Sequence, residues 1–291
     1  MGEVNKVAAG IVAYNPTDSL VDLCRQLIAQ GCAVLVHDNG SADGQSALTA
    51  CAELGAQVHR AEDNSGVAGG LQALFERTRD DFDWLLTFDQ DSRIEDGYVA
   101  SLTNSPALSN RRVAIVAPRV IENATGQIVQ GRPEATSWHQ LDRVITSGAL
   151  CRLRALAEVA GFRPDLFIDY VDYDLCLRLR ASDWLVVVEP AAVLHHSIGS
   201  QSVHRLLGLI PITTSNHSAD RQFYKYRNYV LLTRDGTLWL DARWALLDGL
   251  ALLWGPAKII LFEDHKRAKL RAIGQGVVRG FRGRTGTRND S

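Results

Sequence analysis

The sequence is poor in cysteine, and the cysteines that it has form no recognisable pattern. The five residues are irregularly spaced, their number is odd, and no Cys-x-x-Cys pair occurs. This spacing is typical neither of a disulfide framework nor of a cysteine-based zinc site. We therefore expect reduced, mostly buried thiols, as in a cytosolic protein.

The sequence also lacks a long uninterrupted hydrophobic run. The segment after Lys6 is apolar at once, without the basic region, long apolar run and cleavage site of a signal peptide, so we expect no such leader. No stretch of about 18 apolar residues occurs. The nearest candidate, Gly249–Phe262, is interrupted by Pro256 and Lys258. We therefore expect no membrane-spanning helix and a cytoplasmic location.

The sequence has almost no excess of charge of either sign, but its charges are unevenly distributed along the chain. The 31 Lys and Arg nearly balance the 33 Asp and Glu, for a net charge of −2, and no nucleic-acid-binding motif occurs. We expect no nucleic-acid partner. Residues 258–291 hold nine basic and three acidic residues, a net charge of +6, which leaves −8 on the preceding 257 residues. An acidic body with a basic tail suggests separate roles for the two parts.

What is present is an ordinary globular composition with alternating strand and helix patterns. With 291 residues, 46% hydrophobic and 22% charged, the chain suits one large α/β domain or two small ones. Short apolar runs predict strands at Lys6–Tyr14, Ala33–His37, Gly55–Arg60 and Trp84–Phe88. Helical spacing predicts helices at Ser19–Gln30, Gln45–Leu54 and from Asn64 to about Thr78. This alternation is typical of a mainly parallel sheet covered on both faces.

The rest of the chain is less regular. Apolar runs predict strands at Val113–Arg119 and Leu185–Val188, and Ser147–Arg154 reads as a strand that turns into a helix. A helix is expected over Tyr170–Ala181, and the pattern is helical again from Arg221 onward. Gly, Ser, Pro, Thr and Asn are dense between residues 200 and 220. We therefore expect a catalytic domain over residues 1–205 and a helical region over residues 206–291.

Acidic residues follow two of the predicted strands. Asp38 comes after the second strand, and Asp89 and Asp91 come after the fourth. In parallel α/β sheets, ligands bind at the carboxyl ends of the strands. Mg²⁺ and Mn²⁺ take oxygen ligands, commonly one or two carboxylates plus substrate phosphates. The Asp-x-Asp pair therefore predicts a metal site, although two such residues can also cap a turn.

A second acidic group lies among apolar and aromatic residues. Asp169 and Asp172 belong to it, and carboxylates in such surroundings have raised pKa values that suit a general base. Capping of the helix that begins there is the alternative. His195 and His196 follow the predicted strand at Leu185–Val188, where a histidine is either structural or a third metal ligand.

The C-terminal third leaves two questions open. Tyr224 and Arg227 share a helix, where they either pack against the sheet domain or face an acceptor. Trp239, Trp244 and Trp254 alternate with Leu and precede the basic tail. This composition fits an interfacial helix on anionic lipid or a core-packed amphipathic helix with a basic face.

Seven segments together resemble the inverting nucleotide-sugar glycosyltransferases of glycosyltransferase family 2, in the family's order and over about 190 residues. They are IVAYNP, VHDNGSAD, DNSGVAGGL, FDQDS, SGALCRLRAL, GFRPDLFIDYVDYDLCLRLR and HHSIG. The variants DQD, FIDYVDYDLCLR and HSIG, followed by RQFYKYRNYVLL, most resemble the bacterial rhamnosyltransferase branch. The resemblance implies a GT-A fold with a C-terminal helical extension, a Mg²⁺ or Mn²⁺ cofactor, and transfer of L-rhamnose from dTDP-β-L-rhamnose.

The resemblance also implies roles for individual residues. The nucleotide would be bound by Tyr14, Asn15, Pro16, Asp38, Asn64, Gly66, Asp89 and Gln90. Asp38 would accept a hydrogen bond from the base N3–H, which uracil and thymine both offer. The metal would be held by Asp89, Asp91 and His196, with His195 as the alternative histidine. Asp172 would be the catalytic base and Asp169 its reserve, because Val171 departs from the family's paired acidic residues.

The same resemblance implies an acceptor and a location. The acceptor would be a saccharide or a lipid-diphosphate-linked sugar, in O-antigen or other surface-polysaccharide synthesis. Tyr224 and Arg227, the candidates from the helical pattern above, are then expected to bind it. The protein would lie in the cytoplasm or on the inner face of the plasma membrane, and its oligomeric state is left open. A UDP-hexose-dependent enzyme and an inactive sugar-nucleotide-binding scaffold are the alternatives. A nicotinamide dehydrogenase is disfavoured, because GVAGG is not a G-x-G-x-x-G motif after the first strand.

Overall fold

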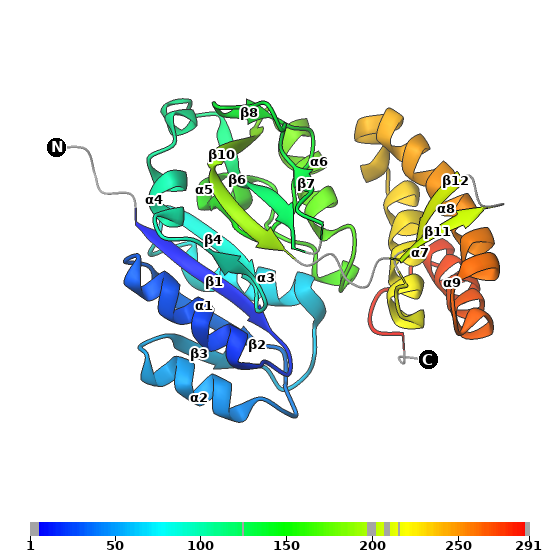
Figure 1. Ribbon diagram of the computed structural model, residues 1–291, viewed down its shortest axis with the longest axis horizontal. Coiled ribbons are helices and arrows are strands. Elements are labelled where there is room, and N and C mark those ends of the chain that lie inside the picture. Colours follow the sequence, from blue (N-terminus) through cyan, green and yellow to red (C-terminus); the bar gives the residue numbers. More distant parts are fainter. Residues whose placement is uncertain (1–5, 124, 197–201, 207–209, 215, 289–291) are drawn as a thin grey trace.

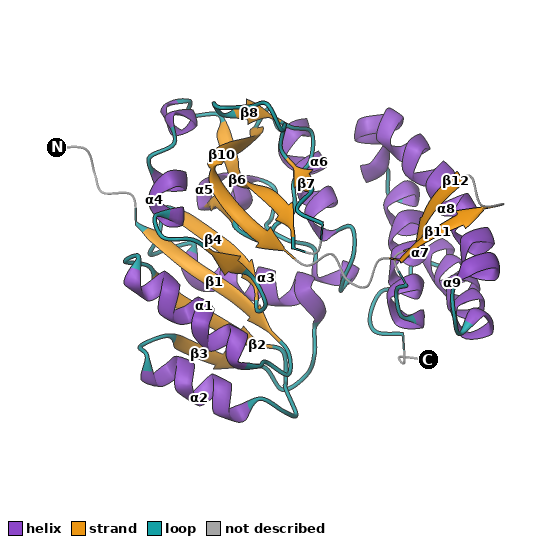
Figure 2. Ribbon diagram, viewed as in Figure 1, coloured by secondary structure: helices purple, strands orange, loops and turns teal. Residues whose placement is uncertain are grey.

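The first half of the chain alternates strands and helices as its hydrophobic pattern predicts. The computed structural model describes residues 6–123, 125–196, 202–206, 210–214 and 216–288 (Figures 1 and 2). Its first strands are β1 (Val7–Ala13), β2 (Ala33–Asp38), β3 (Gln57–Arg60) and β4 (Trp84–Asp89). The helices between them are α1 (Asp18–Ala29), α2 (Gln45–Glu53) and α3 (Gly66–Thr78). All seven predicted elements are confirmed.

The second half contains shorter elements. Its strands are β5 (Arg93–Ile94), β6 (Val113–Glu122), β7 (Ile128–Gln130), β8 (His139–Gln140), β9 (Ala149–Arg152), β10 (Leu185–His196), β11 (Ser202–Leu206) and β12 (Ile210–Thr214). Its α-helices are α4 (Tyr98–Thr103), α5 (Leu153–Glu158), α6 (Val171–Ala181), α7 (Ala219–Arg234), α8 (Ala242–Phe262) and α9 (Lys266–Phe281). Short 3₁₀ turns are η1 (Pro106–Ser109), η2 (Pro164–Leu166) and η3 (Thr237–Asp241). The helical C-terminal region is confirmed, and a β11–β12 hairpin precedes it.

The sheet is mixed, with a parallel N-terminal half. Its strand order is β3-β2-β1-β4-β9-β6-β10-β5, and β3, β2, β1 and β4 are mutually parallel. The short strand β9 is antiparallel to both of its neighbours, β4 and β6. In register, Ala13 of β1 lies opposite Asp38, and Val12 lies opposite Asp89. The carboxyl ends of three neighbouring strands therefore meet at one edge of the sheet.

Two hydrophobic clusters form the main core. One contains Leu20, Leu23 and Leu27 of α1, and the other joins α3 and α6 to residues of α7 such as Leu232. Because α7 contributes to the second cluster, the C-terminal helices pack on the sheet domain; Figure 1 shows α7, α8 and α9 gathered beside it. All five cysteines are buried and unpaired, which confirms the expectation of free thiols.

Helix α8 corrects the expectation that Pro256 and Lys258 interrupt the apolar run. The helix is continuous over 21 residues, with Pro256 inside it. Together with η3 it forms one segment, Thr237–Phe262, that is long and apolar enough to cross a membrane by length and composition, and only 17% of its most apolar window is buried. A linear apolar run ends at Pro256 and Lys258, whereas the helix continues through both residues.

Neighbouring side chains explain why Pro256 is tolerated. Proline has no N–H to donate to the carbonyl four residues earlier. That carbonyl, on Leu252, accepts a hydrogen bond from the Tyr226 hydroxyl at 2.7 Å instead. Tyr229 likewise donates to the carbonyl of Ala245 at 3.0 Å. Two tyrosines of α7 thus attach one side of α8 and leave its other side exposed.

Candidate active site

Four of the predicted aspartates line one cavity at the carboxyl edge of the sheet. The cavity has a volume of about 380 Å³, and its lining includes Asp89, Asp91, Asp169 and Asp172. Asp89 is the last residue of β4 and Asp91 follows it, and the other two come from the segment at the start of α6. Residues about 80 positions apart in the sequence are therefore brought together, as the placement at strand ends predicts. We call this space the aspartate cavity.

An adjoining cavity of about 250 Å³ gathers five of the eight predicted nucleotide-binding residues. These are Tyr14, Asn64, Gly66, Asp89 and Gln90. The Gln90 amide accepts from the Tyr14 N–H at 2.8 Å and donates to the Tyr14 carbonyl at 3.1 Å. Asp89 lines both cavities, so the two spaces meet there.

The glycine at the start of α3 brings two chain segments close together. Gly66 has a φ of +73°, and a Cβ there would overlap the carbonyl oxygen of Phe167. That carbonyl accepts from the N–H of Ala68 at 3.0 Å. A residue without a side chain is therefore needed at this point of the cavity wall.

The other three predicted nucleotide-binding residues lie outside that cavity lining. Asp38 is 0% exposed and accepts from the N–H and hydroxyl of Ser41 and from Arg60 Nε at 3.0 Å. Asn15 Oδ1 accepts from two backbone N–H groups of the loop after β2, each at 3.1 Å. Pro16 is buried. Asp38 and Asn15 therefore hold the loop after β2 in place. Contact of Asp38, Asn15 and Pro16 with a nucleotide stays a prediction.

Asp172 has the electrostatics expected of a general base. Burial raises the pKa of its carboxyl to about 6, and the negative charges of Asp169 and Asp89 act in the same direction. The N–H of Tyr173, which donates to Asp172 Oδ1 at 2.9 Å, partly opposes this rise in pKa. A carboxyl group with a pKa near neutrality accepts a proton more readily than an ordinary aspartate does.

Asp169 lies in a strained segment and is already paired. Phe167, Asp169 and Tyr170 all have positive φ values, between 62° and 66°. Left-handed backbone at residues other than glycine is costly and clusters at functional sites. Asp169 Oδ1 accepts from Arg221 Nε at 3.2 Å, which partly offsets the rise in the Asp169 pKa caused by burial. This ion pair leaves Asp172 as the better placed base of the two.

Arg221 is a cavity residue for which the sequence analysis predicted no role. It comes from the first turn of α7 and lines the aspartate cavity beside the four carboxylates. Its only signal in the sequence is its place at the head of the segment RQFYKYRNYVLL, whose resemblance to the family gave no residue-level assignment. The C-terminal region thus supplies a cation to a space that is otherwise strongly acidic.

The prediction that Arg227 and Tyr224 face the acceptor disagrees with their positions. Arg227 is 0% exposed and donates to the carbonyls of Asp165 and Leu166 at 2.7 and 2.9 Å. Tyr224 is also buried and stacks on Phe167 with ring centroids 4.6 Å apart. Both side chains therefore belong to the packing seam that was the alternative, and both support the segment that carries Asp169.

The histidines are only partly described. His195 lies in β10, and its Nε2 is 3.0 Å from Glu95 Oε1; it does not line the aspartate cavity. The side chain of His196 lies outside the described part of the structure. Within that part, no group of three or more His, Cys, Asp or Glu is arranged to hold an ion. Asp89 and Asp91 fit a divalent cation that takes one or two carboxylates and completes its shell with phosphates and water.

Comparisons with known proteins agree with this geometry. Residues 9–154, just over half of the chain, match the family described as glycosyl transferase family 2. The chain is 28% identical over 257 residues to the dTDP-rhamnosyl transferase RfbF of Shigella flexneri, an alignment that covers 79% of this chain and 80% of that protein. The match supports the rhamnosyltransferase-type branch of the family.

A solved structure supports the fold. The crystal structure of GalNAc-T7 with UDP, GalNAc and Mn²⁺ superposes with a TM-score of 0.59 at 14% identity. The match covers 79% of this chain and 48% of the other, so this chain spans about half of that protein. At this identity the likeness concerns the fold alone, and it confirms the expected GT-A architecture.

Proposed function

This chain belongs to glycosyl transferase family 2, and from that premise we propose that it transfers L-rhamnose from dTDP-β-L-rhamnose to a saccharide acceptor. Glycosyl transfer itself follows from the family. The choice of donor is supported by the similarity to a protein named as a dTDP-rhamnosyl transferase. The observation that carries the proposal is the aspartate cavity, which joins the Asp-x-Asp pair to a carboxyl group of raised pKa.

The donor's nucleotide would occupy the cavity lined by Tyr14, Asn64 and Gly66. Asn15, Pro16 and Asp38 would complete this site, with Asp38 accepting from the base N3–H. The diphosphate would then extend past Asp89 into the aspartate cavity, because Asp89 lines both spaces.

The diphosphate needs positive charge in a cavity with four carboxylates. Asp89 and Asp91 would hold Mg²⁺ or Mn²⁺, with a histidine of the pair 195–196 as a further ligand. When bound, the cation would stabilise the negative charge that develops on the leaving diphosphate. Arg221 would add a second positive charge from α7.

Asp172 would accept the proton of the acceptor hydroxyl as its oxygen attacks the anomeric carbon. The bond between that carbon and the phosphate oxygen breaks, and dTDP leaves with the bonding electrons. With attack on the face opposite the leaving group, a β-L-rhamnosyl donor gives an α-L-rhamnoside. Proton acceptance by a positioned carboxylate contributes roughly 10²–10⁴-fold in rate. Asp169 is the reserve base.

The two parts of the chain would have different roles. Residues 1–205 would bind the nucleotide sugar and catalyse transfer, and residues 206–291 would bring the enzyme to a lipid-linked acceptor on the inner face of the plasma membrane. The net charge of +6 on residues 258–291 and the exposed apolar side of α8 support this part of the proposal. Such a reaction belongs to surface-polysaccharide synthesis of the O-antigen type.

A panel of nucleotide sugars tests the proposed reaction. The purified protein would be incubated with dTDP-rhamnose, UDP-glucose or UDP-galactose and with Mg²⁺, Mn²⁺ or EDTA, and release of the nucleoside diphosphate would be measured. We expect release from dTDP-rhamnose that depends on the cation. Turnover of UDP-glucose but not dTDP-rhamnose would contradict the donor assignment. Binding of a nucleotide sugar without turnover of any would favour an inactive scaffold.

A further inference from the structure

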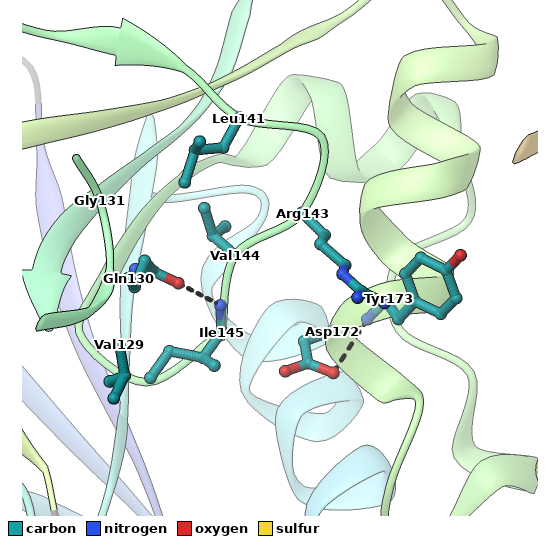
Figure 3. Close-up of a pocket in the computed structure, with 9 residues that line it drawn as sticks. All are labelled: Val129, Gln130, Gly131, Leu141, Arg143, Val144, Ile145, Asp172 and Tyr173. Atoms are coloured by element: carbon teal, nitrogen blue, oxygen red, sulfur yellow. Dashed lines mark hydrogen bonds between the residues drawn. The ribbon is translucent and has the colours of Figure 1, made fainter. Parts of the chain in front are cut away.

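A second large cavity lies on the other side of Asp172. Its volume is about 440 Å³, within the range of small-ligand pockets, about 300–1,000 Å³. Figure 3 shows that Asp172 and Tyr173 of α6 form one wall, and that residues around β7 and the loop before β9 form the other. The lining residues are Val129, Gln130, Gly131, Leu141, Arg143, Val144, Ile145, Asp172 and Tyr173.

This cavity meets the aspartate cavity at two residues. Asp172 and Ile145 line both spaces, whereas Asp89 and Asp91 line the aspartate cavity and not this one. In a single displacement the nucleophile approaches from the side opposite the leaving group. The base must touch the nucleophile, and the diphosphate must lie near the Asp-x-Asp pair. The space beyond Asp172, away from that pair, is therefore the side from which an acceptor hydroxyl can reach the base.

Arg143 is the cation of this cavity, and the C-terminal region holds it in place. Its guanidinium carbon lies 3.9 Å from the ring centroid of Trp244 and 4.9 Å from that of Tyr173. Its Nη1 donates to Asp248 Oδ2 at 3.3 Å. Trp244 and Asp248 belong to α8 and Tyr173 to α6, so three contacts from two helices fix the orientation of one side chain.

Arg143 also has donors to spare. A guanidinium carries five N–H groups, and within the described residues this side chain donates a single hydrogen bond, to Asp248. Gln130, the other long polar residue of the lining, already donates to the Pro118 carbonyl at 2.8 Å and accepts from the Ile145 N–H at 2.7 Å. Because Asp248 balances the charge of Arg143, the site suits a neutral ligand rich in hydroxyl groups rather than an anion.

We propose that this cavity binds the acceptor saccharide and that Arg143 determines how tightly the acceptor binds. The proposal rests on the proposed transferase function and names the acceptor site for it. Hydroxyl oxygens of the sugar accept from the guanidinium, and Val129, Leu141 and Ile145 face its C–H groups. The acceptor's attacking hydroxyl is then directed at Asp172. Arg143 is a binding and positioning residue and takes no part in proton transfer.

The Arg143→Ala variant separates this role from catalysis. The full-length protein would be assayed with dTDP-rhamnose and Mg²⁺, first with water as the only acceptor and then with octyl glucoside, galactoside, rhamnoside and N-acetylglucosaminide as acceptor probes. We expect the acceptor KM to rise about tenfold or more, as loss of a charged hydrogen bond implies. Donor KM and the rate of donor hydrolysis should stay within about twofold.

Val129→Trp provides a second variant that leaves the Arg143 contacts intact. Val129 is 47% exposed, so a larger side chain fits at the surface but fills the mouth of the cavity. We expect the same rise in acceptor KM. Arg112→Ala is the matched control, because Arg112 is likewise an arginine that donates to an aspartate, Asp183, and it lies away from both cavities. Melting temperatures would identify any unfolded variant.

Each outcome bears on the proposal. Unchanged acceptor KM in both variants, or donor and acceptor KM rising together, would overturn it. So would a parent protein that hydrolyses the donor but neither binds nor glycosylates any octyl glycoside. Failure of the parent to turn over dTDP-rhamnose even with water would instead count against the proposed donor, and saccharide binding measured by saturation-transfer NMR would then test the cavity alone.

Discussion

At the scale of single residues, Asp172 and Asp174 illustrate how neighbours with the same local sequence context acquire different roles. Both lie in the first turn of α6. Asp174 is fully buried and pairs with Arg178 at 2.6 Å and Arg163 at 3.6 Å. Asp172, by contrast, accepts from local backbone N–H groups and lines two cavities. Ion pairing makes Asp174 structural, whereas the position of Asp172 between two cavities suits the proposed base.

Asp172→Asn should abolish transfer while donor binding survives. Loss of the proton acceptor predicts a fall in kcat of about 10²–10⁴-fold. In the parent protein the base must be deprotonated, and its pKa is about 6. The kcat/KM for transfer should therefore fall as the pH drops through about 6 and level off above about 7, and rates measured from pH 5 to 8 would show this.

Two aspartate variants control for this experiment. Asp183→Asn removes an exposed carboxylate away from both cavities and should have no effect on rate. Asp169→Asn removes the partner of Arg221 and should reduce activity less than Asp172→Asn does. If Asp172→Asn turned over normally while Asp169→Asn lost the acid limb of the pH profile, Asp169 would be the base.

Arg227 shows where prediction from sequence ends at this scale. Its helical position left two options, packing or contact with the acceptor. The choice depends on backbone carbonyls of Asp165 and Leu166, about 60 residues away in the sequence. Neighbouring Asn228 bonds the Leu166 carbonyl too, and two further carbonyls, those of Ile168 and Asp169. No pattern local to α7 indicates that its polar side chains support a strained loop from another part of the chain.

At the scale of elements, the start of α3 is the most constrained point of the nucleotide cavity. Gly66 combines a positive φ with close approach to Phe167. Gly66→Ala should therefore lower the free energy of unfolding by about 1–3 kcal/mol through strain and overlap. Displacement of Phe167 should also weaken dTDP binding, measured by calorimetry.

Gly31→Ala is the control for backbone strain alone. Gly31 ends the turn after α1 with a φ of +83°, and a Cβ there would meet no atom within 4 Å. This variant should lose stability by about 1 kcal/mol and bind dTDP normally. Equal losses of dTDP affinity in both variants would mean that the contact between Gly66 and Phe167 does not shape the nucleotide cavity.

Elements were predicted best where their hydrophobic pattern is local. The strands and helices between residues 7 and 89 have clear periodicity, and each was expected within a few residues of its position. The short strands β7 and β8 have three and two residues, and their pairing with β6 and β10 defines them. The Asp-x-Asp position followed from the strand before it, whereas the position of Arg143 depends on its contacts with Tyr173 of α6 and Trp244 of α8.

At the scale of the whole molecule, one helix, α8, both contacts the proposed acceptor cavity at Arg143 and exposes apolar side chains. Trp244 and Asp248 of α8 contact Arg143, and the same helix exposes Leu250, Leu253 and Trp254. Leu253 is 77% and Trp254 66% exposed. Residues spaced by three and four lie on one side of a helix, so these side chains form a continuous apolar stripe. A lipid-linked sugar could reach the cavity from a surface to which this stripe is bound.

Membrane attachment predicts a particular dependence on lipid charge and on α8. The protein should co-sediment with phosphatidylglycerol-containing vesicles more strongly than with pure phosphatidylcholine, because residues 258–291 carry a net charge of +6. Raising the salt concentration should weaken this preference.

The variant Leu250→Glu/Leu253→Glu should lose vesicle binding and keep its donor hydrolysis, since both residues are exposed and lie on the side of α8 away from Tyr226 and Tyr229. Gln45→Glu/Gln57→Glu adds the same charge on α2 and β3 and should bind vesicles like the parent. Equal binding to neutral and anionic vesicles, or none to either, would remove the electrostatic part of this attachment.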